Sequence, residues 1–144
     1  MSKITAFVLF VAATFLAVVA QADDLTAICA GHFTQTGSFF SGKKASTWLD
    51  LAGVSKADAY SRLLVALNKD GWAVQQQDKD AGIINATQQV SFGNGAKAPL
   101  NVVIESADAG SRATITFSTA AGQAASKDTM QTKMCGYLVA ATGK

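Results

Sequence analysis

The alternation of apolar and polar residues between Trp72 and Ser118 constrains the fold of this 144-residue chain more than any other feature. A period of two is typical of strands that have one buried face and one solvated face. The first run places Trp72, Val74 and Gln76 on one face. Three further runs have core positions Ile84, Ala86, Gln88, Val90 and Phe92, then Leu100, Val102 and Ile104, then Ala113, Ile115 and Phe117. Turn residues separate the runs, so the pattern predicts four antiparallel strands in a meander.

Amphipathic segments flank the predicted strands on both sides. Ser55 and Asp58 form a capping-box-like helix start, and Gly71 supplies a left-handed stop. Between them an apolar stripe recurs at helical spacing: Ala59, Leu63, Ala66 and Leu67. Ser126 can cap a final helix with the stripe Met130, Met134, Leu138 and Ala141. The order predicts an α+β two-layer sandwich, in which a four-stranded antiparallel meander has a helix before it and a long C-terminal helix packed on one face.

The amino terminus has the pattern of an export signal. Met1-Ser2-Lys3 precedes an uncharged apolar run that ends at Ala20-Gln21-Ala22. This predicts a secretory signal peptide over residues 1–22 and a mature chain that starts at Asp23. The alternative is a membrane anchor, but a run of about 17 residues lies at the lower limit for spanning a bilayer. We therefore expect a periplasmic or secreted protein with no stable membrane span after cleavage.

The mature chain is long enough for one domain with its own core. Residues 55–144 contain the predicted helices and strands and form a helix-β4-helix domain, and residues 23–54 precede it as an N-terminal segment. In that segment, Asp23 to His32 can form a short helix. Phe33 to Trp48 is rich in Thr, Ser and Gly, which fits either a loop or an irregular strand.

Cys29 and Cys135 are the two cysteines of the sequence. An even number in an exported chain favours a disulfide, which would tie the start of the mature chain to its last helix. The alternative is a thiol or zinc site that uses Cys29 and His32. One Cys and one His are too few ligands for zinc, and the sequence has no second histidine. We expect the disulfide, and neither a metal nor another cofactor.

The charge balance and the single histidine argue against two classes of function. Without Lys3, the 12 basic residues fall to 11, against 10 acidic ones, and Lys43-Lys44 is an isolated pair. Nucleic acid is therefore not an expected partner. A Ser or Cys nucleophile would have no predictable base, because His32 is the single histidine. We expect the protein not to be an enzyme and to have no catalytic residues.

The stretch AYSRLLVALNKDGWAVQQQDKDAGIINA is similar to the small domains of BamC-type outer-membrane accessory lipoproteins. In those domains a helix runs into a Gly-aromatic-x-Val strand, an acidic turn and a Gly-Ile strand. The matching residues here are Ala59, Leu63, Ala66, Leu67, Gly71, Trp72, Val74, Asp80, Gly82 and Ile83. The order of elements also resembles helix-grip, or TATA-binding-protein-like, sandwiches. The resemblance covers Ser55 to Ala141 and implies the fold of a small periplasmic domain.

Two binding functions are compatible with these features. The first is an interaction module that binds an envelope protein partner through the solvated sheet face, whose polar side chains are Gln75, Gln77, Thr87, Gln89, Asn101, Arg112, Thr114 and Thr116. The second is a carrier of a small apolar ligand, because helix-grip folds can open a cavity between the long helix and the sheet. The side chains expected either to line such a cavity or to fill the core are Trp72, Phe92, Phe117, Met130, Met134 and Tyr137.

Overall fold

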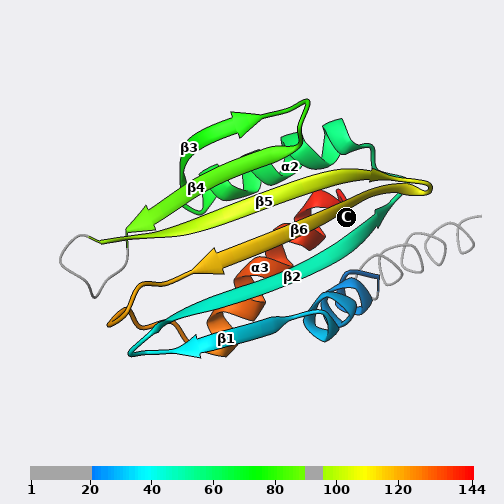
Figure 1. Cartoon of the computed structure of the whole chain (residues 1–144). Coiled ribbons are helices and arrows are strands. Elements are labelled where there is room, and N and C mark those ends of the chain that lie inside the picture. Colours follow the sequence, from blue (N-terminus) through cyan, green and yellow to red (C-terminus); the bar gives the residue numbers. More distant parts are fainter. Residues whose placement is uncertain (1–20, 90–95) are drawn as a thin grey trace, which may run out of the picture.

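The computed structural model describes residues 21–89 and 96–144. All but the last two residues of the predicted signal peptide lie outside these ranges, as does Phe92. A helix over residues 21–31 comes first. It is followed by β1 (Thr34–Ser38), β2 (Gly42–Ala52), α2 (Lys56–Lys69), β3 (Ala73–Asp78), β4 (Ile83–Gln89), β5 (Lys97–Ala107), β6 (Gly110–Ser118) and α3 (Lys127–Ala141). Figure 1 shows these elements in order along the chain.

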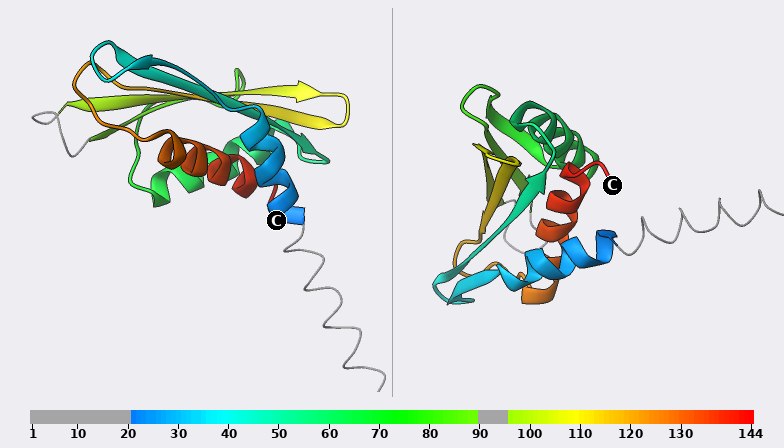
Figure 2. Two further views of the ribbon diagram at one scale, coloured as in Figure 1. Left: turned by 90° about the horizontal axis from the view of Figure 1, so that it is seen from below. Right: turned by 90° about the vertical axis from the view of Figure 1, so that its right-hand side faces the viewer.

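The described strands form one six-stranded antiparallel sheet in the order β1-β2-β6-β5-β4-β3. The helices lie on one side of it, and the other face is left open (Figure 2). The α+β class is therefore confirmed. The expected four-stranded sheet is wrong in its strand number, because residues 34–52 add β1 and β2 next to β6.

The strand β2 carries a weak sequence signal because the first two of its core-facing residues are small or polar. Ala45, Thr47, Leu49 and Leu51 point into the core, and even the hydroxyl-bearing Thr47 is fully buried. What holds β2 in place is its long backbone pairing with β6, from Lys44 opposite Ser118 to Ala52 opposite Gly110. Such pairing depends on the neighbouring strand and leaves little trace in local periodicity.

A β-bulge in β3 changes which of its glutamines share the open face. The register shifts between Val74 and Gln76, so that Gln76 lies opposite Asn85 and the next residue, Gln77, opposite the buried Ile84. The side chain of Asn85 donates a hydrogen bond to Gln76 Oε1 at 3.1 Å. The prediction that Gln77 belongs to the open face and Gln76 to the core face is therefore wrong, because one extra residue reverses the alternation.

Both long helices start where their capping residues predict. The Ser55 side chain accepts a hydrogen bond from the backbone of Asp58 at the start of α2, and Ser126 does the same for Thr129 at the start of α3. Gly71 follows α2 with a φ of 81°. No helix within residues 21–89 and 96–144 is long and apolar enough to cross a membrane.

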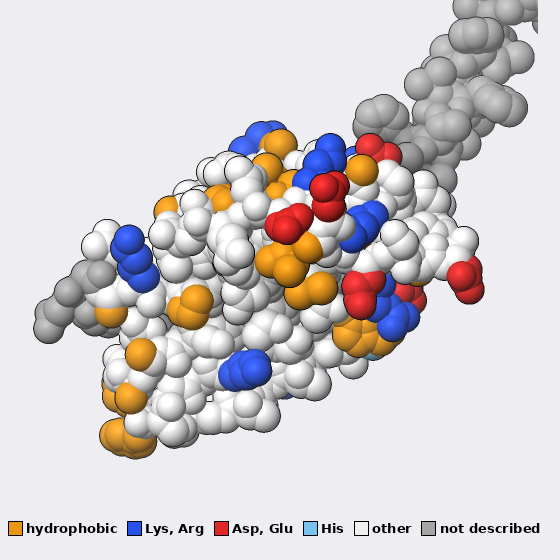
Figure 3. Space-filling view, turned by 45° about the horizontal axis from the view of Figure 1, so that its top comes forward, with side chains coloured by type: hydrophobic (Ala, Val, Ile, Leu, Met, Phe, Trp, Pro, Cys, Tyr) orange, Lys and Arg blue, Asp and Glu red, His pale blue; other side chains and the backbone are white. Residues whose placement is uncertain are grey.

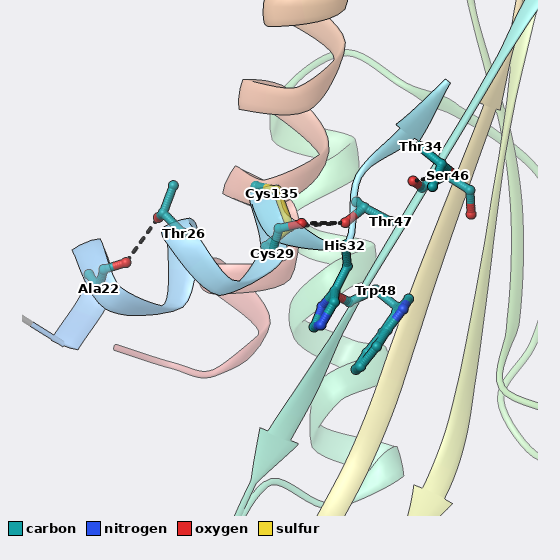
Figure 4. The surroundings of a disulfide bond; sticks show 9 residues. All are labelled: Ala22, Thr26, Cys29, His32, Thr34, Ser46, Thr47, Trp48 and Cys135. Carbon is teal, nitrogen blue, oxygen red and sulfur yellow. Dashed lines mark hydrogen bonds between the residues drawn. A yellow bond between two sulfur atoms is a disulfide. The ribbon is translucent and has the colours of Figure 1, made fainter. Parts of the chain in front are cut away.

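A disulfide joins Cys29 to Cys135 across 106 residues of sequence, as expected. It connects the helix over residues 21–31 to the middle of α3, and both cysteines are buried (Figure 4). The Thr47 hydroxyl donates to the Cys29 carbonyl oxygen at 2.8 Å, which links the same helix to β2. The first helix is thus bound to both layers of the sandwich.

Candidate functional site

A pocket of about 430 Å³ opens between the N-terminal half of α3 and the sheet, at the end where β4 and β6 finish. Its wall contains Trp72 before β3, Leu100 of β5, Phe117 of β6 and the methionines of α3. The rim is formed by polar and small residues, which are Gln88, Gln89, Ala124, Ala125, Ser126, Thr129 and Lys133. This volume falls within the range of about 300–1,000 Å³ that is usual for small-molecule pockets.

The pocket brings together most of the side chains expected at a helix-sheet cavity. Trp72, Phe117, Met130, Met134 and Tyr137 all line it, and Phe92 lies outside the described residues. The Trp72 and Phe117 rings meet edge to face, with centroids 5.9 Å apart. Aromatic and thioether side chains make a wall that adapts to apolar ligands of different shape.

Other lining residues were not expected from the sequence. Leu100 had a detectable signal, since it shares the core face of its strand with Val102 and Ile104. The segment 124–126 was expected only to provide the helix cap at Ser126, and nothing in its Ala-Ala-Ser sequence indicated a pocket. It reaches the pocket because the connection from β6 to α3 folds back across the end of the sheet (Figure 1).

A chain of polar contacts closes one side of the pocket. Trp72 Nε1 donates to Tyr137 Oη at 2.9 Å, and the Tyr137 hydroxyl in turn donates to Asp70 Oδ2. Lys133 Nζ binds the same carboxylate oxygen at 2.7 Å. Because these polar groups are bonded to one another, the adjoining wall of the pocket is mainly apolar.

The same contacts change the acidity of two groups. The Lys133 ammonium, and after it the Tyr137 hydroxyl, hold the pKa of Asp70 below its usual range, because both donate hydrogen bonds to the ionised carboxylate. Burial is the main cause that raises the pKa of Tyr137, and its bond to Asp70 adds to the effect. Tyr137 is therefore a neutral hydrogen-bond donor at neutral pH, and Asp70 is ionised.

The sole histidine lies away from this pocket. His32 stacks on Trp48, with ring centroids 3.5 Å apart and planes 11° from parallel, and its Nδ1 lies 3.1 Å from the Trp48 carbonyl oxygen (Figure 4). The Arg112 guanidinium lies 4.1 Å from the Trp48 ring centre and pairs with Asp50 at 2.6 Å. These residues form an aromatic and ionic cluster on the sheet. Among the described residues, no three His, Cys, Asp or Glu side chains come together as a metal-binding group.

No family model and no curated protein sequence matches this chain.

Proposed function

We propose that this chain is a non-enzymatic binding module exported to the bacterial cell envelope, and that it holds a small apolar ligand in the pocket between α3 and the sheet. The observation that carries the proposal is the convergence of Trp72, Phe117, Met130, Met134 and Tyr137 on one opening of about 430 Å³. Those residues come from three separate parts of the chain.

The polar rim favours a ligand with one polar end. The lining residues Gln88, Gln89, Ser126 and Thr129 offer amide and hydroxyl groups at the mouth, whereas Leu100 and Met134 lie deeper and are almost fully buried. An amphipathic molecule can place its apolar part inside and keep its polar group hydrated.

The resemblance to BamC-type and helix-grip domains enters the proposal at the level of fold. It accounts for a long helix lying across an antiparallel sheet, which is where such domains open a cavity. Interaction with an envelope protein through the open sheet face is the second candidate. The observation that favours it is that the helices leave this face uncovered (Figure 2). Trp48, Asp50 and Arg112 belong to this face, because they alternate with the buried residues Thr47, Leu49, Leu51, Ser111 and Ala113.

The test is binding of the fluorescent apolar probe N-phenyl-1-naphthylamine to the purified, export-processed protein. Ala124→Trp places a large ring at the pocket mouth and should weaken probe binding by at least about tenfold, or about 1.4 kcal/mol. Ala121→Trp is the matched control, because Ala121 is exposed in the same connection but does not line the pocket. Equal probe affinity in the wild type and the Ala124→Trp variant would contradict the proposal.

Native mass spectrometry of protein purified from its own cell envelope is a second test of ligand binding. A discrete extra mass that leaves on denaturation would identify the natural ligand and its class. A soluble protein recovered in stoichiometric amount instead, with the pocket empty, would favour the sheet-face hypothesis over the carrier hypothesis.

A further inference from the structure

The turn between β1 and β2 exposes two phenylalanines. The side chain of Phe40 is 87% exposed and that of Phe39 46% exposed, and their rings meet edge to face with centroids 5.5 Å apart. Hydrophobic side chains gather at the lower left of Figure 3, the end at which the β1–β2 turn lies in Figure 1. Exposing two large apolar rings to water is energetically unfavourable. Their exposure therefore indicates a surface that a binding partner covers.

Hydrogen bonds within the turn and to the β6–α3 connection hold this turn in place. The side chain of Ser38 accepts from the backbone of Ser41, and that of Ser41 accepts from the backbone of Ser38. Outside the turn, the Phe39 carbonyl oxygen accepts a hydrogen bond from the backbone of Gly122 at 2.8 Å, and Lys43 Nζ donates to the Ala125 carbonyl oxygen at 2.8 Å. The phenylalanines are therefore presented by an ordered turn tied to the β6–α3 connection.

The charges around the turn are mainly positive. No Asp or Glu occurs within residues 34–49 or 113–127, the two segments that meet at this end. Lysines lie at the start of each neighbouring element: Lys43 and Lys44 in β2, Lys97 in β5 and Lys127 in α3. Asp128 is the adjoining acid. On the face drawn in Figure 3, the acidic side chains gather toward the opposite end. An aromatic tip with cations around it complements an anionic surface.

We propose that the β1–β2 turn docks this protein on an anionic phospholipid bilayer. Phe39 and Phe40 enter the interface, and the exposed Lys44 and Lys97 face the lipid phosphates, whereas the Lys43 ammonium is bound to the Ala125 carbonyl oxygen. A bilayer is favoured over an acidic protein because the mouth of the pocket, at Gln89 and Ala124, lies at the same end of the molecule. Docking there brings the mouth to the surface in which amphipathic molecules are dissolved. The docking itself does not require the pocket to hold a ligand.

The experiment is sedimentation of the export-processed protein with vesicles of phosphatidylglycerol and phosphatidylcholine, and with vesicles of phosphatidylcholine alone. Phe39→Ser combined with Phe40→Ser should lower partitioning by at least about tenfold. Val65→Ser is the matched control, since Val65 is 52% exposed on α2, away from the turn. Lys44→Ser should lower partitioning about fivefold on anionic vesicles only, and Lys79→Ser in the β3–β4 turn should leave it unchanged.

A spectroscopic probe reports insertion directly. In Phe40→Trp the added tryptophan should shift its emission to shorter wavelength when anionic vesicles are added, after subtraction of the wild-type signal from Trp48 and Trp72. Thermal unfolding verifies that each variant is folded. Equal partitioning of the wild type and the double serine variant, or unchanged emission from the added tryptophan at saturating lipid, would overturn the proposal. Turn-dependent binding to a soluble acidic protein without vesicle binding would also overturn it.

Discussion

The indole N–H of Trp72 and the phenolic oxygen of Tyr137 lie 2.9 Å apart although 65 residues separate them in the sequence. The hydrogen bond joins the chain just before β3 to the middle of α3, and Tyr137 passes a second bond on to Asp70. One phenol therefore connects the sheet, the end of α2 and the wall of the pocket. Both rings are almost fully buried, at 6% and 8% exposure.

Tyr137→Phe should lower the free energy of unfolding by about 2 kcal/mol, because the buried indole N–H of Trp72 loses its acceptor and Asp70 loses a donor. Urea denaturation followed by circular dichroism measures the change. Tyr60→Phe is the control with the same chemical alteration, since Tyr60 is buried but its hydroxyl makes no hydrogen bond to another residue that the structure describes. It should change stability by less than about 0.5 kcal/mol. Equal losses in the two variants would show that the Trp72–Tyr137 bond contributes nothing particular.

Asp70 should make stability depend on pH in the acid range. Its pKa is lowered in the native state, first by Lys133 and then by Tyr137, whereas an unfolded Asp has a pKa of about 3.9. Its contribution is present above about pH 4 and is lost as the pH falls through the native value. The Asp70 side chain is 38% exposed, so solvent screening limits the effect to about 0.5 kcal/mol.

Denaturation at pH 6 and at pH 3 tests this sign, with Asp70→Asn beside the wild type. The variant should lose less stability on acidification, because its side chain cannot take up the proton. Asp50, whose pKa is lowered by Arg112, is present in both proteins and cancels from the comparison. Equal losses of stability in the two proteins would show that Asp70 does not contribute to the pH dependence.

Reduction of the Cys29–Cys135 disulfide should lower the free energy of unfolding by about 4–5 kcal/mol, because the bond closes a loop of roughly 100 residues in the unfolded chain. Denaturation with and without dithiothreitol measures the effect. The double variant Cys29→Ser with Cys135→Ser should match the reduced wild type. Hydrogen exchange should show the greatest loss of protection in residues 21–31, whose remaining contacts include the Thr47 to Cys29 hydrogen bond and the packing of Leu25 against the core. An unchanged denaturation midpoint on reduction would contradict the prediction.

Gly82→Ala should be one of the most destabilising single-methyl changes in this chain. Gly82 has a φ of 76°, and a Cβ there would lie 2.2 Å from the Ile104 carbonyl oxygen. We expect a loss above about 2 kcal/mol, since backbone strain and a clash combine. Gly53→Ala separates the two terms: its φ is 72°, but no atom lies within 4 Å of the added Cβ, so about 1 kcal/mol should be lost. Similar losses at the two sites would show that the clash is relieved.

Local patterns determined a good part of this fold. The caps Ser55 and Ser126 and the apolar stripes that follow them set the two long helices, because helix ends and faces depend on residues within a few turns. Alternation from Ile84 to Phe117 set three strands and their core face for the same reason. The pairing of Cys29 with Cys135 followed from there being two cysteines in a chain expected to be exported.

The tertiary structure alone decided the features that bear on function. β2 joins the sheet through backbone bonds to β6, and the bulge at Val74 and Gln76 reverses one strand's faces, because both depend on the partner strand rather than on the strand's own residues. The pocket required α3 to cross Trp72 and Phe117, which are distant in sequence. Lys43-Lys44, an isolated pair in the sequence, lies at the same end of the molecule as Lys97 and Lys127, because the starts of β2, β5 and α3 all lie there (Figure 1).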